Sequence, residues 1–151
     1  MIRMWQVHSV LAMVLLLGTG PLVAAPMMVT KKVEMRQALD DLTLAAANHD
    51  MQLVKVQPID SALVKRGYED PHVRIAFVGS ETTVRWAEAA DPRLLNLLPL
   101  RLSLVQRGDS IVIIADDLEP WKQEFKDSPG LLLLEALEIE VKALLQDFAR
   151  Q

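Results

Sequence analysis

The fold is decided by residues 94–115, which read LLNLLPLRLSLVQRGDSIVIIA. From residue 100 to 106, apolar and polar side chains largely alternate, and a period of two is typical of a half-buried strand. Residues 111–115 are apolar on both faces and rich in β-branched side chains, which favours a strand near the middle of a sheet. Gly108 lies between the two runs and can adopt the positive φ of a tight hairpin turn. We therefore expect this stretch to form the central hairpin of a sheet.

Shorter strands and helices are expected on either side of the hairpin. Asn48 is predicted to end the first helix in the left-handed conformation. Residues 58–71 form the longest irregular stretch, with a short helix suggested at 61–65. The strand patterns cover residues 27–32, 51–57 and 72–78, and the helical patterns cover residues 32–48, 82–90 and 118–126.

The last predicted element is a long, strongly apolar helix. Ser128 is a favourable N-cap and Pro129 suits the first helical position, so we expect the helix to run from there to about Ala149. Such a helix is more apolar than packing on a sheet requires, which predicts contact with a second surface such as another subunit. One face carries Leu131, Leu134, Leu137, Val141, Leu144 and Phe148, and Leu132, Leu133, Ile139 and Leu145 widen it.

These elements predict an α+β fold with two layers. Strands that follow one another through short links pair antiparallel, so the sheet should be mainly antiparallel and curved, with helices on one face and the long C-terminal helix across it. Residues 26–151 are long enough for a single domain with its own core. We expect one domain over that range.

The first 25 residues have the pattern of a secretory signal peptide. Arg3 supplies the positive start, residues 10–17 are an unbroken apolar run, and small residues at 23–25 offer a cleavage site. We therefore expect a periplasmic or otherwise exported protein. Two features leave an alternative open: Pro26 disfavours cleavage before it, and the apolar composition continues almost to Val29. An uncleaved segment would anchor the domain to a membrane, and contact with a membrane is expected only in that case.

Charge and cysteine content exclude several functions. Without residues 1–25 the chain has 15 basic and 20 acidic side chains, a formal net charge of −5. No basic stripe remains to neutralise phosphates, so a nucleic-acid partner is not expected. The chain contains no cysteine. This rules out a cysteine nucleophile, a thiol redox pair, an iron–sulfur cluster and covalently attached haem, and we expect no cofactor.

Several short motifs resemble one known family. They are PID at residues 58–60, KRG at 65–67, AADP at 89–92, LLPL at 97–100, and Gly108 within the hairpin. In these motifs, over roughly residues 29–149, the chain resembles the domain-of-unknown-function 302 (DUF302) family. The resemblance implies a β-α-β4-α fold like that of the TATA-box-binding protein, and a homodimer. It implies no reaction, because the family's function is unassigned.

The chain departs from the family pattern in two places. Many relatives carry Gly-Asn-Pro where this chain reads Gly79-Ser80-Glu81. Some exported relatives have cysteines near that strand end and before the conserved proline, and here Phe77-Val78-Gly79 and Leu98-Pro99 occupy those neighbourhoods. A role that rests on those cysteines cannot be transferred to this chain. Ser80 itself is best explained as the N-cap of a helix.

The sequence favours a non-catalytic binding module that associates with itself and binds a partner protein or a small ligand. Trp86 and Trp121 lie in short segments that flank the hairpin, and exposed aromatic side chains often mark a ligand mouth or an interface. Arg85 and Arg101 could add positive charge to such a mouth. We therefore name Trp86, Arg85, Arg101 and Trp121 as candidate ligand-binding residues.

Two alternatives remain open. Histidine and methionine are ligands that suit copper in an exported protein, so His49 and Met51 could form a metal site, although Met51 is equally suited to filling a core gap. The second alternative is an enzyme of unknown class that uses carboxylates such as Asp60, Glu69 or Asp70. Their spacing does not distinguish them from a solvated loop.

Overall fold

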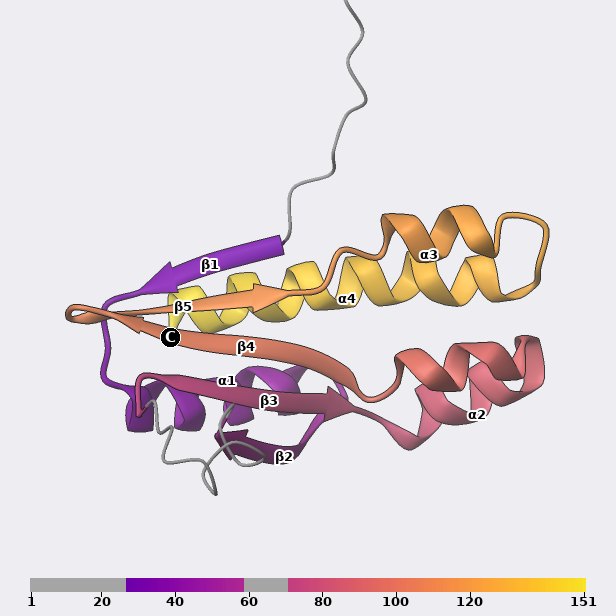
Figure 1. Cartoon of the computed structure of the whole chain (residues 1–151). Coiled ribbons are helices and arrows are strands. Elements are labelled where there is room, and N and C mark those ends of the chain that lie inside the picture. Colours follow the sequence, from indigo (N-terminus) through magenta and orange to yellow (C-terminus); the bar gives the residue numbers. More distant parts are fainter. Residues whose placement is uncertain (1–26, 59–70) are drawn as a thin grey trace, which may run out of the picture.

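The computed structural model describes residues 27–58 and 71–151 (Figure 1). The strands are β1 (Met27–Lys31), β2 (Gln52–Pro58), β3 (Val73–Gly79), β4 (Leu100–Arg107) and β5 (Ser110–Ala115). The helices are α1 (Met35–Asn48), α2 (Glu81–Ala90), the 3-10 helix η2 (Pro92–Leu97), α3 (Glu119–Glu124) and α4 (Gly130–Arg150).

The five strands form one open, antiparallel sheet in the order β1-β5-β4-β3-β2. The predicted hairpin lies at its centre: β4 pairs with β3 on one side and β5 on the other, and Gly108 turns the chain with a φ of 59°. Leu102 lies opposite both Ala76 and Ala115, and all three side chains are buried. The expected fold class, including the first strand and the one-sided helices, is confirmed.

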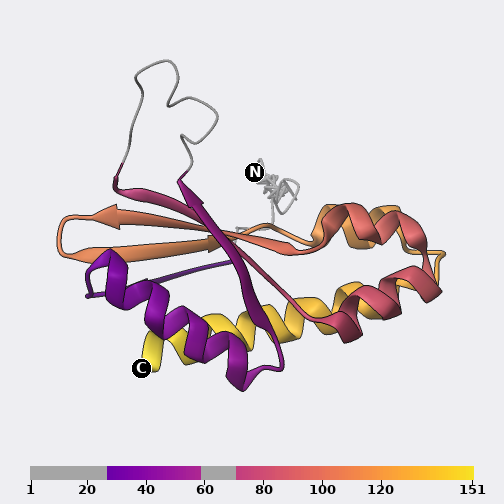
Figure 2. The same cartoon turned by 90° about the horizontal axis from the view of Figure 1, so that it is seen from below.

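Helices α1 and α4 cover one face of the sheet (Figure 2). The alternating pattern of the strands explains this arrangement, because alternate side chains of β4 and β5 point toward the helices. Leu104 and Ile113 from the sheet, Leu42 from α1, and Leu134 and Leu144 from α4 are 0% exposed. Each such side chain contributes about 1.5–3 kcal/mol when buried, before conformational entropy opposes it. We call this region the sheet half.

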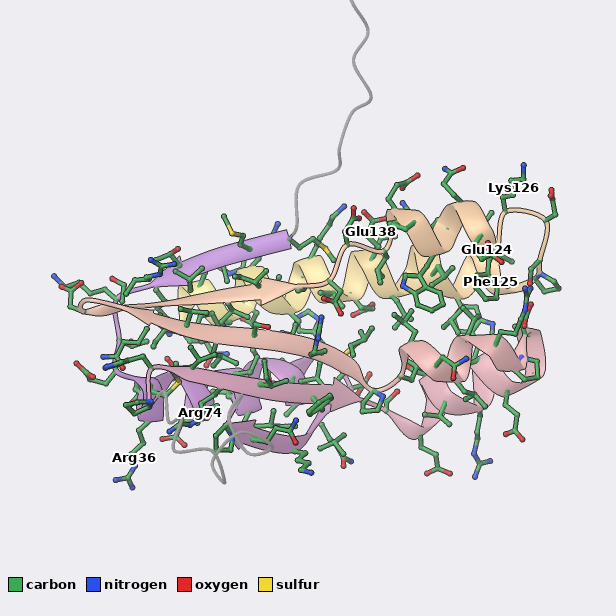
Figure 3. The ribbon with its side chains drawn as sticks, viewed as in Figure 1. Arg36, Arg74, Glu124, Phe125, Lys126 and Glu138 are labelled. Atoms are coloured by element: carbon green, nitrogen blue, oxygen red, sulfur yellow. The ribbon has the colours of Figure 1, made fainter. Side chains whose placement is uncertain are left out.

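The remaining elements extend the molecule beyond the ends of the strands. There α2, η2 and α3 lie near the first turns of α4, and we call this region the helical end (Figure 1). Phe125 lies in its interior, 1% exposed (Figure 3). Trp121 stacks on Phe125 with the ring centroids 6.1 Å apart, and Leu94 and Leu118 are buried nearby.

Three sequence expectations need correction. The left-handed residue after α1 is Asp50, with φ 54°, and not Asn48. The helix continues through Asn48 and the turn comes two residues later, at an aspartate that tolerates this conformation. Residues 92–97 form a 3-10 helix that the strand-like leucine pattern concealed. Helix α4 begins at Gly130, and Ser128 still caps it because its hydroxyl accepts from the Gly130 amide at 3.1 Å.

The apolar stripe of α4 is narrower than the sequence suggests. Leu133 and Leu145 are buried as expected, whereas Leu132 and Ile139 are 65% and 66% exposed. They lie seven residues apart, on one outer face of the helix. Several sequence predictions lie outside the described residues: the predicted signal segment at residues 1–25, the suggested helix at 61–65, and the carboxylates Asp60, Glu69 and Asp70. Among the described helices, none combines the length and apolar character needed to span a membrane.

Candidate ligand-binding groove

A groove with a volume of about 750 Å³ opens between three helices. Its walls are residues 48–50 at the end of α1, the first residues of β2, and residues 80–83 with Trp86 at the start of α2. Leu133, Ala136 and Leu137 of α4 form the floor, where the two leucines are almost fully buried, and Glu140 lies at its edge. Figure 2 shows α1 and α2 meeting α4 from different directions. We call this space the Trp86 groove.

Polar contacts fix the α1 wall against α4. The Asn48 side chain donates to Asp147 Oδ2 at 2.9 Å. His49 Nδ1 lies 3.3 Å from Glu140 Oε2, and its Nε2 lies 4.0 Å from Asp147 Oδ2. His49 therefore joins the end of α1 to two carboxylates of α4, and it holds Glu140 at the edge of the groove.

A helix cap fixes the opposite wall. The Ser80 hydroxyl accepts from the Thr83 amide at 3.1 Å and lies 2.8 Å from the Thr83 hydroxyl. This is the N-cap role expected for Ser80. The cap sets the direction of the first turn of α2 and so the position of Trp86 one and a half turns later. The Trp86 side chain is 42% exposed although it is large and mostly apolar.

The ionisable side chains that line the groove are mostly acidic. Asp50, Glu81 and Glu140 contribute carboxylates, and His49 is the only side chain of the lining that can carry a positive charge. Glu81 pairs with Arg85 one turn along α2, and this pair faces solvent, both side chains being about three-quarters exposed. The groove is therefore acidic, with an exposed indole on one wall and an apolar floor.

A second, more apolar pocket of about 420 Å³ adjoins the groove. The two share Gln52, Ser80, Glu81 and Thr83, so the start of α2 separates them. Val54, Val84 and Leu95 line this pocket and are 61%, 42% and 39% exposed. Val84 and Leu95 of the helical end and Val54 of β2 thus form one continuous exposed apolar region around this pocket.

The four candidate ligand residues do not come together. Arg85 is engaged with Glu81 on the outer side of α2. Arg101 lies on β4 and donates to Asp116 at 2.9 Å, beside a cavity of only about 10 Å³. Trp121 packs on Phe125 within the helical end. Of the four, Trp86 alone lines the groove, and the stretches that flank the hairpin in sequence lie at different places in the fold.

The two metal candidates lie in the same groove as Trp86. His49 and Met51 both belong to its lining, but the Met51 side chain is 5% exposed and packs in the hydrophobic core. Among residues 27–58 and 71–151, no group of three His, Asp or Glu side chains is arranged to hold a metal ion. One residue of the ligand hypothesis, Trp86, and one exposed residue of the metal hypothesis, His49, therefore line the same groove.

Sequence reasoning missed Glu140 and the floor residues of α4. Leu133 and Leu137 were assigned to the packed face, where burial is expected, and they also border the groove. Glu140 was one of several charges on the wet side of the helix. The only sequence signal for it is its place three residues after Leu137, one turn along the same face.

Charged residues also stiffen the helical end. Asp91 accepts from the Arg93 side chain at 2.7 Å and from the Ser128 hydroxyl at 2.9 Å. The Arg93 guanidinium holds the pKa of Asp91 well below its usual range. Lys122 of α3 donates to Glu138 of α4 at 2.6 Å and pairs with Glu119 at 2.7 Å; together the two carboxylates raise its pKa. These contacts fasten η2 and α3 to α4, which is the floor of the groove.

The fold and the groove define a class of small α+β domain: an open antiparallel sheet with a helical layer on one face and a cleft at its end. The model of the family described as "Domain of unknown function DUF302" matches residues 27–148. The chain belongs to the DUF302 family.

A solved structure supports the same conclusion about the fold. The chain is similar to the crystal structure of an uncharacterized conserved DUF302 protein from Bacillus stearothermophilus, with a TM-score of 0.69 and 15% sequence identity. The similarity covers 81% of this chain and 96% of that one. No curated protein matches the sequence. At this identity the likeness establishes the fold and leaves the function to be argued from the groove.

Proposed function

We propose that this protein is a non-catalytic, exported binding module that holds a small ligand in the Trp86 groove. One observation carries the proposal: a half-exposed tryptophan borders an open space of about 750 Å³ whose lining is mostly polar, with a small apolar floor. Concave sites of this size are typical of small-molecule binding. The cap at Ser80 and the contacts of His49 hold the walls without a ligand, so the site is preorganised.

The first test is native mass spectrometry of the protein purified from the expressing cell. A co-purifying organic molecule that is lost in Ala136→Phe would support the proposal, because the larger side chain would fill the groove floor. Ala149→Phe, which enlarges an exposed alanine of the same helix away from the groove, is the matched control. The intact mass also shows whether residues 1–25 are removed, and cell fractionation tests the export that we propose.

The decisive negative result would be a groove that binds nothing. If a broad library of neutral, anionic and cationic compounds leaves the Trp86 indole resonance unchanged, the ligand-binding proposal fails. A copper adduct that disappears in His49→Ala would instead favour the metal alternative. His49 is the better residue to change, because replacing the buried Met51 would also disturb the core.

Self-association is the second part of the proposal, and the outer face of α4 supports it. Leu132 and Ile139 are the two most exposed large apolar side chains of the described residues. With Ala143 they form a stripe at the spacing by which helices pack on one another. Ala136 lies between them and is shared with the groove floor. A second copy of the chain could cover this stripe. Sedimentation at several concentrations should show a dimer for the unaltered protein and a monomer for Leu132→Asp; equal masses would remove this interface.

A further inference from the structure

Three of the described aromatic rings, Trp121, Phe125 and Phe148, have a cation or another ring beside them, whereas Phe77 of β3 and Trp86 do not. Lys31 Nζ lies 5.1 Å from the centre of the Phe148 ring, and Arg93 Cζ lies 4.5 Å from the centre of the Phe125 ring. Trp121 stacks on the Phe125 ring as well. Within the part of the chain that the structure describes, Trp86 has neither a cation nor another ring over it. The indole is the most favourable of the natural rings for binding a cation, and here it faces an acidic groove.

Negative charge in the groove is only partly neutralised. Arg85 pairs with Glu81 at one rim. Glu140 shares one oxygen with His49, and its side chain remains 49% exposed. Asp50 has no ion pair within the described ranges. The lining itself contains no lysine and no arginine, so its formal charge is −3 with His49 neutral. An anionic ligand would meet repulsion from these carboxylates, and a cation would meet attraction.

The floor adds a small apolar surface. It lies mainly at Ala136, because Leu133 and Leu137 also line the groove but are only 2% and 4% exposed. A bare metal ion would gain nothing from this floor or from the ring, and the described residues offer no three-ligand metal cluster. A ligand with both a positive charge and a small hydrocarbon body would satisfy the ring, the carboxylates and the floor together.

We propose that the ligand of the Trp86 groove is an organic cation of the alkylammonium class. This inference rests on the proposed ligand-binding function and specifies its chemistry. The ammonium head lies against the Trp86 ring, Glu140 supplies the nearby countercharge, and the hydrocarbon portion covers the α4 floor. His49 tunes the countercharge, because it contacts the same carboxylate.

A comparison of choline with its uncharged isostere 3,3-dimethylbutan-1-ol separates the contribution of the positive charge from that of molecular shape. Titration of each compound into the ¹⁵N-labelled protein, followed at the Trp86 indole resonance, gives the two affinities. We expect choline to bind about tenfold more tightly, because only the charged compound engages the ring and the carboxylates. Addition of sodium chloride should weaken the binding of choline and leave the binding of the alcohol nearly unchanged.

Two variants with one matched control locate the interaction. Glu140→Gln should weaken choline binding about threefold to fivefold, since one close countercharge is removed at an exposed position. Glu135→Gln makes the same change on α4, at an exposed residue outside the groove lining, and should leave the affinity unaltered. Trp86→Leu keeps an apolar side chain but removes the ring, and we expect a loss of about threefold to tenfold.

The outcomes separate this inference from the proposed function. Equal affinity for choline and the alcohol would overturn the organic-cation assignment and keep a ligand groove. Equal losses in the Glu140→Gln and Glu135→Gln variants would show only a general charge effect, and would also overturn it. Absence of binding by either compound overturns the assignment as well, and the groove then depends on the broader library test. A melting temperature within about 2 °C of the unaltered protein shows that each exposed substitution leaves the fold intact.

Discussion

The sheet half and the helical end of this domain are built to different degrees of closure. In the sheet half, side chains from α1, α4 and the central strands, such as Leu42, Leu144 and Ile113, are 0% exposed. The helical end has an equally buried centre around Phe125 but leaves Trp86 and its neighbours about 40% exposed. The two regions share one helix, α4. The buried contacts of α1, α4 and the central strands provide stability, and the helical end adds the accessible surface around Trp86. The edges of the sheet half are also exposed, at Met28, Leu44 and Val54.

The shared helix shows how one element serves both regions. The side chains that pack on the sheet and those that line the groove alternate along α4 with a helical period. Leu134 faces the core and Leu133 reaches both the core and the groove floor. Because α4 is fixed by the sheet half, it gives the groove a rigid floor, and its side chains need no ligand to hold their positions. Substitutions can test how strictly the two roles are divided.

The largest expected effect is that of Leu134→Asp. Leu134 is 0% exposed, and a buried carboxylate without a partner should destabilise the domain by about 5 kcal/mol or more. That loss is comparable to the whole stability of a domain of this size, so we expect it to unfold. Leu44→Asp is the matched control, at a leucine of α1 that is 55% exposed. Thermal unfolding followed by circular dichroism should separate the two variants completely, and similar melting curves would show that the buried face is misassigned.

Gly130→Ala tests whether the base of the helical end is as tightly packed as the sheet half. A Cβ at Gly130 would lie 2.6 Å from Leu94 Cδ1 and 3.2 Å from Phe125 Cδ1. Overpacking of this kind typically costs about 1–3 kcal/mol, which should exceed the gain in helix propensity. Urea unfolding measures the loss. A neutral or stabilising substitution would mean that the interior of the helical end adapts more readily than its buried side chains indicate.

Gly108→Ala separates steric contact from backbone strain. No atom lies within 4 Å of a Cβ at Gly108, but its φ of 59° is unfavourable for a residue with a side chain. We expect a loss of about 1 kcal/mol, smaller than at Gly130. Urea unfolding of both variants gives the order, and the reverse order would contradict the packing argument for the helical end.

The sheet half could be predicted from the sequence. In the helical end, the helices expected at 82–90 and 118–126 are present as α2 and α3, but the 3-10 helix η2 was not predicted. Alternation over residues 100–106 and the apolar run over 111–115 depend on the sheet alone, so a local pattern was sufficient. The leucines at 94, 95 and 97 form a 3-10 helix, because Asp91 caps it and Pro92 opens it. A cap and a short apolar run are compatible with several structures, and the tertiary contacts of Leu94 decide among them.

The same contrast holds for the candidate site. Trp86 and Trp121 look alike in sequence, since each lies in a short helix beside the hairpin. Trp121 meets Phe125 four residues later and is largely covered, whereas nothing in the described chain covers the face of Trp86 in the same way. Exposure is a property of what packs against a residue, and local sequence does not contain it. Likewise His49 and Trp86 are 37 positions apart, and only the fold brings them to one groove.

Ser80→Ala is expected to have a moderate effect on the groove wall. Loss of the hydroxyl that accepts from the Thr83 amide should destabilise the domain by about 1 kcal/mol. It should also loosen the first turn of α2, so groove ligands should bind more weakly in proportion. Thr82→Ala, an exposed change in the same turn without a cap contact, is the control. The unfolding midpoints of both variants test this prediction. Equal midpoints would show that the Ser80 cap does not stabilise the groove wall.

The smallest effect concerns Asp91, which pairs with Arg93 of η2 and accepts from the Ser128 hydroxyl just before α4. The Arg93 guanidinium and the Ser128 hydroxyl lower the pKa of Asp91. A carboxylate whose pKa is lower in the folded state stabilises the fold above its unfolded pKa of about 3.9, and this contribution is lost as the pH falls toward the folded pKa. The stability difference between the unaltered protein and Asp91→Asn should therefore be constant near neutral pH and shrink below about pH 5.

The size of this effect should be modest, because Arg93 is 60% exposed and water screens the pair. Urea midpoints measured across the acid range give the difference, and Asp127→Asn, which removes an equal charge from an exposed position nearby, is the control. A difference for Asp91→Asn that stays constant down to pH 2 would show that the carboxylate acts through its shape and hydrogen bonds alone. A difference that shrinks with acid would show that the helical end is held together partly by charge.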